Sequence, residues 1–240
     1  MPLRKRTIPR ASQRHENELY RQGFRCIAGL DEVGRGAWAG PVVAAAVILP
    51  RSLKIGTMFD SKNLSEMQRE ELRNKIVLSA ISYATGEASV EEINQLGVTK
   101  ALRLAYIRAL RQLNPQPDIV LLDGLPLKNF EYRHRAIVDG DCKSKCIAAA
   151  SIVAKQYRDA LMTKCAPSYP RYGFQLHKGY GTEQHQQAIL EHGILPIHRM
   201  NYGWLRDWQA GKRPQTQAAR RYFAKLTALG QAKPTPPALV

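Results

Sequence analysis

Long apolar runs and paired metal-binding motifs are missing from this sequence. The longest apolar stretch lies between Pro41 and Pro50, well short of the about 18 residues that a membrane-spanning helix needs. The four cysteines form no paired CxxC sets and the six histidines form no HExxH motif, which argues against a zinc site. No hydrophobic stretch precedes Cys26, so we expect no secretory signal. Unpaired cysteines favour a cytoplasmic protein with reduced thiols and no membrane contact.

Acidic residues are also in short supply. Lys and Arg number 36 against 20 Asp and Glu, which gives a formal charge of +16 and a pI near 9.9. Such a balance usually indicates a polyanionic partner. The excess lies at the ends, because residues 1–25 hold seven basic and two acidic residues and residues 196–240 hold eight and one. Residues 26–195 are nearly balanced, so their acids need an explanation of their own.

The length and composition predict a globular protein with one main core. A chain of 240 residues with 44% hydrophobic and 23% charged residues is ordinary for one large domain with a small appendage. We expect four segments: a basic N-terminal extension (1–25), an α/β core (26–165), a smaller helical C-terminal part (166–229) and a disordered proline-containing tail (230–240).

Local patterns predict alternating strands and helices. Two neighbouring central strands are expected over 26–33 and 40–49, and short strands over 119–123 and 136–138. Capping boxes begin helices at Ser65 and Ser89, the second continuing over 98–113, and Thr182 begins a helix that Gly193 ends. A helix rich in small residues is expected over 144–164. The fold class is therefore α/β, with a mixed sheet flanked by helices.

Four acidic residues lie in or directly after the predicted strands. Asp31 and Glu32 are neighbours inside an apolar strand, so their side chains point to opposite faces and cannot both lie on a solvent face. Asp123 ends a second strand and Asp141 follows a third. Sites in open α/β sheets lie beyond the carboxyl ends of strands, where such acids can converge.

Clustered carboxylates repel one another, so a cation is needed to hold them together. Oxygen ligands without Cys or His favour Mg²⁺ or Mn²⁺. We assign Asp139 to a turn. Asp159 follows Asp141 by eighteen residues, about 27 Å along a straight helix, and we leave it out of the metal site.

A set of motifs follows in order along the chain: Leu30-Asp31-Glu32-Val33-Gly34-Arg35-Gly36 with Gly40-Pro41-Val42, Asp60-Ser61-Lys62, Asp123-Gly124, Gly140-Asp141, Ile147 to Ser151 with Ala154-Lys155, Tyr172-Gly173-Phe174, and His177 to Thr182. In these motifs the sequence resembles the type 2 ribonucleases H, and within them the bacterial ribonuclease HII family, over about residues 26–199.

The resemblance implies a ribonuclease H-like fold with Asp31, Glu32, Asp123 and Asp141 as the catalytic, metal-binding carboxylates of a two-ion Mn²⁺ or Mg²⁺ site. It implies endonucleolytic cleavage of the RNA strand in RNA–DNA hybrids and nicking 5′ of single ribonucleotides in duplex DNA, as in ribonucleotide removal during DNA replication and repair. The products would carry 5′-phosphate and 3′-hydroxyl ends. We expect a monomer, with a sliding clamp as a possible partner.

The substrate contacts expected from this resemblance lie in two loops. Gly34 and Gly36 have no Cβ, so their backbone can approach a ribose closely and contact the 2′-OH that distinguishes RNA from DNA. In similar enzymes the tyrosine at the position of Tyr180 stacks on the following sugar. Its place between two glycines favours exposure, which suits stacking, and the alternative is a loop tyrosine that covers the core. Arg35, Lys62 and Lys178 are candidate phosphate contacts, although each could equally be a solvated surface charge.

The sequence departs from the family pattern in two places. Met200-Asn201-Tyr202 replaces the usual Arg-Ser-Phe after His198-Arg199, and Cys146 stands where serine is common. Two other functions remain open. A non-catalytic basic RNA-binding protein would explain the charge but gives no reason for the four carboxylates. A type III ribonuclease H carries an additional N-terminal domain, for which 25 residues before Cys26 are too few.

Overall fold

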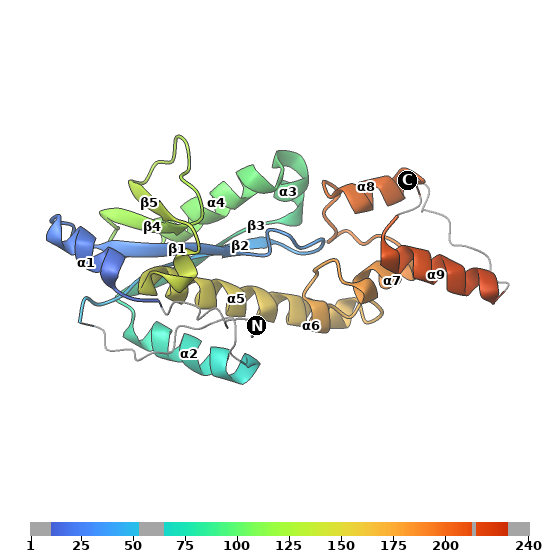
Figure 1. The fold of residues 1–240 in the computed structure, drawn as a ribbon, viewed down its shortest axis with the longest axis horizontal. Coiled ribbons are helices and arrows are strands. Elements are labelled where there is room, and N and C mark those ends of the chain that lie inside the picture. Colours follow the sequence, from blue (N-terminus) through green and yellow to red (C-terminus); the bar gives the residue numbers. More distant parts are fainter. Residues whose placement is uncertain (1–10, 53–64, 213–214, 230–240) are drawn as a thin grey trace, which may run out of the picture. The chain divides into compact units, whose positions relative to one another are not determined.

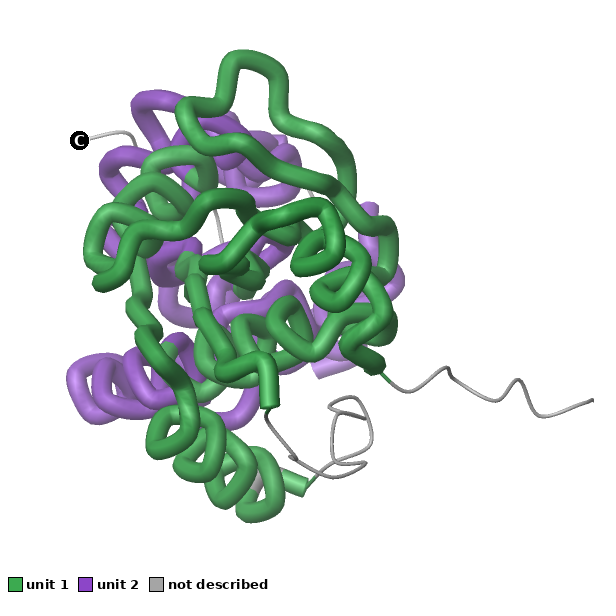
Figure 2. The backbone as a smooth tube through the Cα atoms, turned by 90° about the vertical axis from the view of Figure 1, so that its left-hand side faces the viewer, with its two compact units in different colours: residues 1–33, 43–87, 102–157 green, residues 34–42, 88–101, 158–240 purple. Residues whose placement is uncertain are grey.

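The computed structural model describes residues 11–52, 65–212 and 215–229. The chain forms two compact units, each built from three stretches of sequence (Figure 2). Unit 1 takes residues 1–33, 43–87 and 102–157, and unit 2 takes residues 34–42, 88–101 and 158–240. Each unit is described separately below.

Unit 1 is built on a five-stranded sheet in the order β3 (Ser82–Ala88), β2 (Val42–Ile48), β1 (Ile27–Val33), β4 (Ile119–Asp123) and β5 (His134–Ile137). β1 pairs antiparallel with β2 and parallel with β4, and β4 pairs parallel with β5. Helices α4 (Val98–Arg111) and α5 (Lys145–Cys165) cover opposite faces of this sheet (Figure 1). The predicted α/β class with a mixed, helix-flanked sheet is confirmed.

Helix ends agree well with the capping chemistry in the sequence. Ser65 begins α2 (Glu66–Ser79) with the predicted capping box, and Thr182 begins α7 (Glu183–His192), which Gly193 ends. The second capping box, at Ser89, begins α3 (Val90–Leu96). The continuation to residue 113 is a separate helix, α4, because Gly97 between them has a positive φ of 79°.

Strand β3 is absent from the sequence prediction, and its inward face explains why. The residues that it buries are small, Ala84, Gly86 and Ala88, and lack the β-branched signature of a strand. A Cβ added to Gly86 would lie 2.3 Å from the carbonyl oxygen of Ala105 on α4. Because helix and strand lie so close together, the buried positions of β3 can hold only small residues, and the large side chains by which a strand is recognised are missing.

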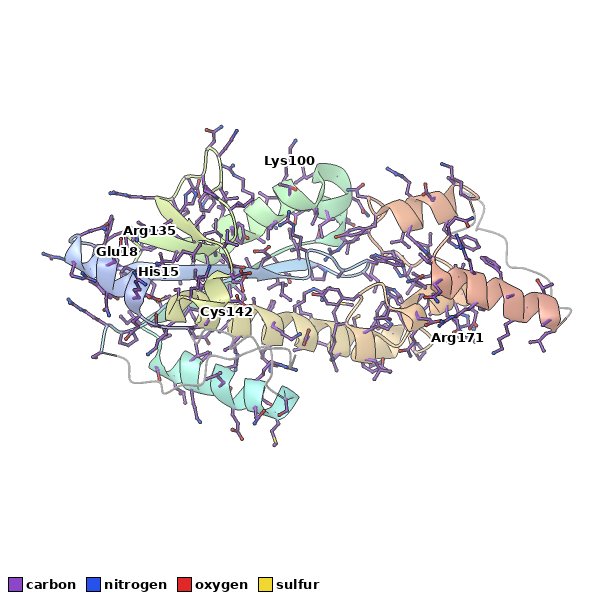
Figure 3. All side chains as sticks on the ribbon, viewed as in Figure 1. His15, Glu18, Lys100, Arg135, Cys142 and Arg171 are labelled. Atoms are coloured by element: carbon purple, nitrogen blue, oxygen red, sulfur yellow. The ribbon has the colours of Figure 1, made fainter. Side chains whose placement is uncertain are left out.

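Helix α1 (Arg14–Arg21) packs onto unit 1, although it falls inside the predicted basic extension. Leu19 is fully buried, and Glu16 is 1% exposed. One carboxylate oxygen of Glu16 accepts hydrogen bonds from the Ser144 hydroxyl at 2.7 Å and the Cys146 amide at 3.0 Å, at the start of α5. A carboxylate at this position stabilises a helix N-terminus. Glu18 on α1 pairs with Arg135 on β5 at 3.0 Å (Figure 3).

Unit 2 is mostly helical and has an aromatic core. Its elements are the short helices η3 (Ala166–Ser168), α6 (Phe174–His177) and α8 (Gly203–Gln209), the longer α7 and α9 (Gln217–Ala228), α3, and the C-terminal end of α5. Phe174 and Trp208 are among its largest buried side chains. All three tryptophans of the protein belong to this unit. No helix of the described residues is long and apolar enough to cross a bilayer.

Candidate active site

Two of the predicted carboxylates lie side by side at the centre of the unit 1 sheet. The parallel register of β1 and β4 pairs Leu30 with Leu122, so Asp31 and Asp123 occupy the next positions on neighbouring strands, at their carboxyl ends. Asp31 is only 6% exposed. One oxygen of its carboxylate accepts a hydrogen bond from the Glu32 amide at 2.7 Å.

Asp31 and Glu32 are held by helices on opposite faces of the sheet, as the alternation of a strand requires. Asp31 forms a side-chain hydrogen bond with Ser151 on α5. Glu32 accepts a hydrogen bond from the hydroxyl of Tyr106 on α4. Each carboxylate is therefore fixed by a different helix.

Asp141 lies in a short 3₁₀ helix, η2 (Gly140–Cys142), after β5. The amide of Gly140 donates a 2.6 Å hydrogen bond to Asp123, which ties this turn to the end of β4. Asp139 has a positive φ of 52° at the start of the turn, a conformation that Asp tolerates better than most residues. Asp139 thus has a backbone role in this turn, while Asp141 follows it on η2.

Burial and mutual repulsion dominate the electrostatics of this group. Burial, then the charges of Glu32 and Asp123, hold the pKa of Asp31 well above its usual range, against the opposing hydrogen bond of Ser151. Burial also raises the pKa of Asp123, with a smaller contribution from the charge of Asp141. These carboxylates therefore interact with one another, and a cation nearby would favour their ionised forms.

Tyr106 and Ser151 contact the carboxylates but were not predicted as site residues. Tyr106 is 3% exposed, and burial followed by the charge of Glu32 raises the pKa of its hydroxyl. Its neighbours at helical spacing, Leu102 and Ala109, are apolar and buried. The only sequence signal that could have identified Tyr106 was its single hydroxyl on an otherwise apolar helix face.

The donor chemistry of the group fits a hard divalent cation. The side chains that act on Asp31, those of Ser151, Glu32 and Asp123, offer hydroxyl and carboxylate oxygens. No set of three or more His, Cys, Asp or Glu side chains among the described residues has the geometry of a ready-made metal site. Mg²⁺ commonly binds through one or two carboxylates together with substrate phosphate, so a complete protein cage is not required.

The Gly34-Arg35-Gly36 segment belongs to unit 2, although it directly follows β1 in the chain. Gly34 is buried with φ of 83°, and a Cβ at this position would lie 2.1 Å from the side chain of Arg158. Arg35 and Gly36 are exposed. A Cβ on Gly36 would meet nothing within 4 Å, so packing within the protein explains Gly34 but gives no reason for glycine at 36.

Tyr180 also lies in unit 2 and is half-buried. Its backbone pairs with that of Ala37 in an isolated antiparallel β-bridge. The guanidinium of Arg158 lies 5.4 Å from the centre of its ring. The ammonium of Lys178 donates to the Thr163 hydroxyl at 2.6 Å and to a backbone carbonyl at 2.8 Å. Lys62, the remaining predicted phosphate contact, lies outside the described residues.

Both departures from the expected family pattern have contacts within the protein, the first by packing and the second by hydrogen bonds. Cys146 is 2% exposed and belongs to the core of unit 1. In unit 2, the Met200 amide and the Asn201 side chain donate hydrogen bonds to Asn94 and Ile93 on α3. The hydroxyl of Tyr202 donates to the carbonyl of Arg35.

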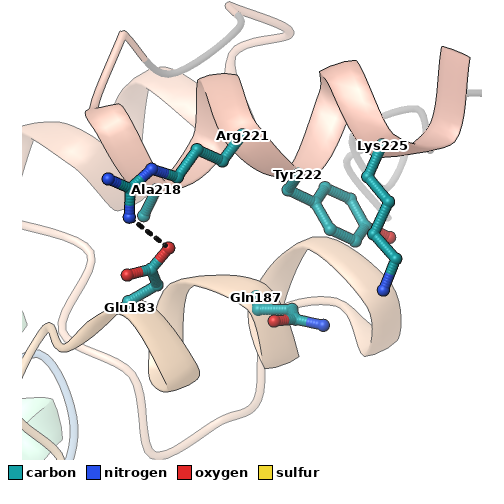
Figure 4. A pocket seen from close by; sticks show the side chains of 6 residues that line it. All are labelled: Glu183, Gln187, Ala218, Arg221, Tyr222 and Lys225. Carbon is teal, nitrogen blue, oxygen red and sulfur yellow. Dashed lines mark ion pairs between the residues drawn. The ribbon is translucent and has the colours of Figure 1, made fainter. Parts of the chain in front are cut away.

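A hollow of about 170 Å³ lies between α7 and α9 in unit 2 (Figure 4). The carboxylate that lines it, that of Glu183, is paired with Arg221 at 3.6 Å. The remaining lining comes from Gln187, Ala218, Tyr222 and Lys225. The predicted site residues are not among them, and this described lining holds no acid cluster that could bind metal ions.

Comparison with known proteins gives a consistent result. The family model described as Ribonuclease HII matches residues 28–204. The ribonuclease HII of Acetivibrio thermocellus is 46% identical over 188 residues, covering 78% of this chain and 73% of the relative. That of Endomicrobium trichonymphae is 46% identical over 193 residues, covering 80% and 92%.

Solved structures have the same fold. The ribonuclease H2 of Pyrococcus horikoshii matches with a TM-score of 0.65 at 24% identity, covering 83% of this chain and 99% of that one. The ribonuclease HII of Archaeoglobus fulgidus, solved in complex with PCNA, matches with a TM-score of 0.63 at 25% identity over 74% and 95%. With a carboxylate pair on adjacent parallel strands and a family match over most of its length, this chain belongs to the ribonuclease HII family.

Proposed function

We propose that Asp31, Glu32, Asp123 and Asp141 bind two divalent metal ions and form the catalytic centre for RNA cleavage. The observation that carries the proposal is the register of β1 and β4, with buried Asp31 next to Asp123 at the carboxyl ends of two parallel strands. Their raised pKa values support it, because neighbouring cations would offset the cost of ionising them.

Membership of the family gives the reaction. The protein is a ribonuclease HII, an endoribonuclease that cleaves RNA in RNA–DNA hybrids and at single ribonucleotides in DNA. The family uses divalent metal ions. The choice between Mn²⁺ and Mg²⁺ in this chain stays a prediction.

The protein's own residues would hold the reacting groups in position. Divalent ions held by the four carboxylates would supply activation of the attacking water and stabilisation of the leaving 3′-oxygen, which would give 5′-phosphate and 3′-hydroxyl ends. Ser151 and Tyr106 restrict the carboxylates of Asp31 and Glu32 to one orientation each. Such outer partners normally matter for metal affinity nearly as much as the ligands do.

Ribose recognition falls to Gly34, Arg35 and Gly36 in this proposal. Gly36 is exposed and its missing Cβ leaves open space, which suits close approach of a sugar to the backbone. Tyr180 offers a half-exposed ring for stacking on the sugar that follows the ribonucleotide. Arg35 is an exposed candidate for a phosphate contact, and Lys62 and Lys178 remain candidates.

The deciding experiment uses one duplex with a single ribonucleotide and one with a continuous RNA strand. We expect nicking 5′ of the ribonucleotide with Mn²⁺ or Mg²⁺, loss of nicking with chelator, and recovery when metal is restored. Binding of both duplexes without metal-dependent cleavage would instead support a basic RNA-binding protein. A third duplex of the same sequence, made of DNA alone, is the matched control and should stay intact.

Partners beyond nucleic acid are a separate proposal. The archaeal relative was solved with PCNA, so we propose that a sliding clamp recruits this protein as well. Co-elution of a monomer of this chain with a clamp in gel filtration would support this, and separate elution at micromolar concentrations would contradict it. A monomeric state and a cytoplasmic location remain predictions from the sequence.

A further inference from the structure

Two arginines of unit 2 are fully buried, and their guanidinium groups donate mainly to backbone carbonyls. Arg158 and Arg199 are both 0% exposed. Burial lowers the pKa of both groups, that of Arg199 to about 10. A buried cation is costly unless most of its N–H groups are satisfied, so the groups that accept from these arginines indicate what they are for.

Their acceptors are concentrated in the segment 34–41. Arg199 donates to the carbonyls of Gly34 at 2.6 Å, Gly40 at 2.8 Å and Pro41 at 2.9 Å. A longer bond of 3.3 Å reaches the carbonyl of Arg35. One side chain thus contacts both ends of the segment and fixes the distance between them.

Arg158 holds the same segment from a second direction. It donates to the carbonyls of Pro41 at 2.9 Å and Ala39 at 3.0 Å. Its remaining nitrogen donates to the carbonyl of Lys178 at 3.0 Å, and its guanidinium lies over the ring of Tyr180. Arg158 therefore joins the 34–41 segment to the loop that carries Tyr180.

Tyr202 adds a contact to the same segment through its hydroxyl. Its hydroxyl donates to the carbonyl of Arg35, and Arg199 donates to the same hydroxyl at 3.4 Å. A phenylalanine at this position would have no hydroxyl to make these bonds. Together the three side chains satisfy the carbonyls of Gly34, Arg35, Ala39, Gly40 and Pro41.

We propose that Arg158, Arg199 and Tyr202 are positioning residues that turn the carbonyls of segment 34–41 inward, so that the segment meets the ribose 2′-OH with the backbone N–H of the exposed Gly36, since the amides of residues 37–40 already donate within the protein. This inference rests on the proposed role of Gly34-Arg35-Gly36 in ribose recognition. A 2′-OH both donates and accepts, whereas deoxyribose offers neither group. Carbonyls that are already bonded to guanidinium groups leave donation by the protein as the favoured contact.

The expected effect is largest on a single ribonucleotide. In a continuous RNA strand every sugar has a 2′-OH, so a displaced segment still meets one; in a DNA duplex with one ribonucleotide it must meet a unique group. The informative quantity is therefore the ratio of kcat at a single ribonucleotide to kcat on a continuous hybrid. A purely structural role would lower both rates together.

The test compares Tyr202→Phe, Arg158→Lys and Arg199→Lys with the controls Tyr222→Phe and Arg171→Lys. Tyr222 lies on α9, and Arg171 is exposed in unit 2 (Figure 3). We expect the ratio to fall about 3-fold for Tyr202→Phe and about 10-fold or more for the arginine variants, from loss of hydrogen bonds to charged groups, with KM little changed. The controls should keep the ratio of the unaltered protein.

Folding is checked independently in each variant. Trp38 lies within the segment and stacks on Trp204 at 4.8 Å, so tryptophan emission reports on its surroundings. If the lysine variants lose this emission and unfold, Tyr202→Phe alone decides, because it removes a single hydroxyl. An unchanged ratio in folded variants would overturn the inference. Absence of cleavage by the unaltered protein would instead contradict the proposed function.

Discussion

The two units bury charges of opposite kinds. In unit 1 the buried ionisable side chains include Glu16 and Asp31, whereas in unit 2 they include Arg158, Arg199 and three histidines. Burial, together with the charges of neighbouring carboxylates, raises the pKa values of Asp31 and Asp123 in the first unit, which suits an added cation. The arginines of the second are satisfied by backbone carbonyls. One unit is thus arranged for metal chemistry, and the other for holding loops in shape.

The largest effect on activity is expected when one carboxylate charge is removed from unit 1. Asp31→Asn and Asp123→Asn should each lower cleavage by about a thousand-fold or more, because metal ions contribute several kcal/mol to such reactions. Binding of the hybrid in chelator, measured by fluorescence anisotropy, should change little. Asp139→Asn is the matched control and should stay active, since Asn also tolerates a positive φ. Cleavage by Asp31→Asn at the normal rate would refute the assignment.

A smaller effect is expected from the hydroxyl that orients Glu32. Tyr106→Phe should reduce kcat by about 10- to 100-fold, the usual cost of losing an outer partner of a metal ligand. Tyr83→Phe, on an exposed tyrosine of the same unit, provides the control. The half-saturating metal concentration should rise in Tyr106→Phe only. If both variants behave alike, the contact between Tyr106 and Glu32 has no catalytic role.

In unit 2 the effect should depend on the substrate. Tyr180→Ala should slow nicking at a single ribonucleotide by about 10-fold, taking for the sugar contact the lower part of the roughly 1–3 kcal/mol that a base gains by stacking on an aromatic ring, and should affect long hybrids less. Tyr180→Phe keeps the ring and should remain close to the unaltered protein. Equal losses on both substrates in Tyr180→Ala would argue against stacking on the sugar.

The histidines of unit 2 predict a modest pH dependence of its stability. Burial lowers the pKa of His185 to about 3 and that of His198 to about 4. Their stabilising contribution is complete above the unfolded pKa near 6.5 and is lost as the pH falls toward the folded values.

The free energy of unfolding should therefore decrease below pH 6.5, by up to about 1.4 kcal/mol per pH unit for each histidine. Urea titrations followed by tryptophan emission at pH 7 and pH 5 measure it for unit 2, where all the tryptophans lie. His15→Gln, in unit 1, should leave the difference unchanged. Identical urea midpoints at both pH values would contradict the prediction.

Local chemistry made much of this fold predictable. The helix caps at Ser65, Ser89 and Thr182 can be recognised from the few residues that follow them in the sequence. All three begin helices. The acids Asp31 and Asp123 stood out because carboxylates are unusual in apolar strands. Strand β3 was missed because its buried residues are small.

The supporting residues could not be predicted in the same way. Tyr106 reaches Glu32 across 74 positions of sequence, and Arg158 reaches Pro41 across 117. Nothing near either residue indicates its partner, because both lie within ordinary helical patterns. An isolated polar side chain on a buried helix face indicates a functional contact only after the structure shows what that face packs against.

The contact between the Glu16 carboxylate and the start of α5 has a consequence for folding during translation. Its bonds to Ser144 and Cys146 join residues 128 and 130 positions apart. Translation produces α1 well before these partners, because they follow it by more than a hundred residues. Contacts of such long range are closed late in folding. Until then the carboxylate of Glu16 lacks these two donors, and in a nascent chain stalled before residue 144 only the apolar contacts of Leu19 with residues such as Ile119 and Leu121 can hold α1, so α1 should be more sensitive to proteases there than in the finished chain.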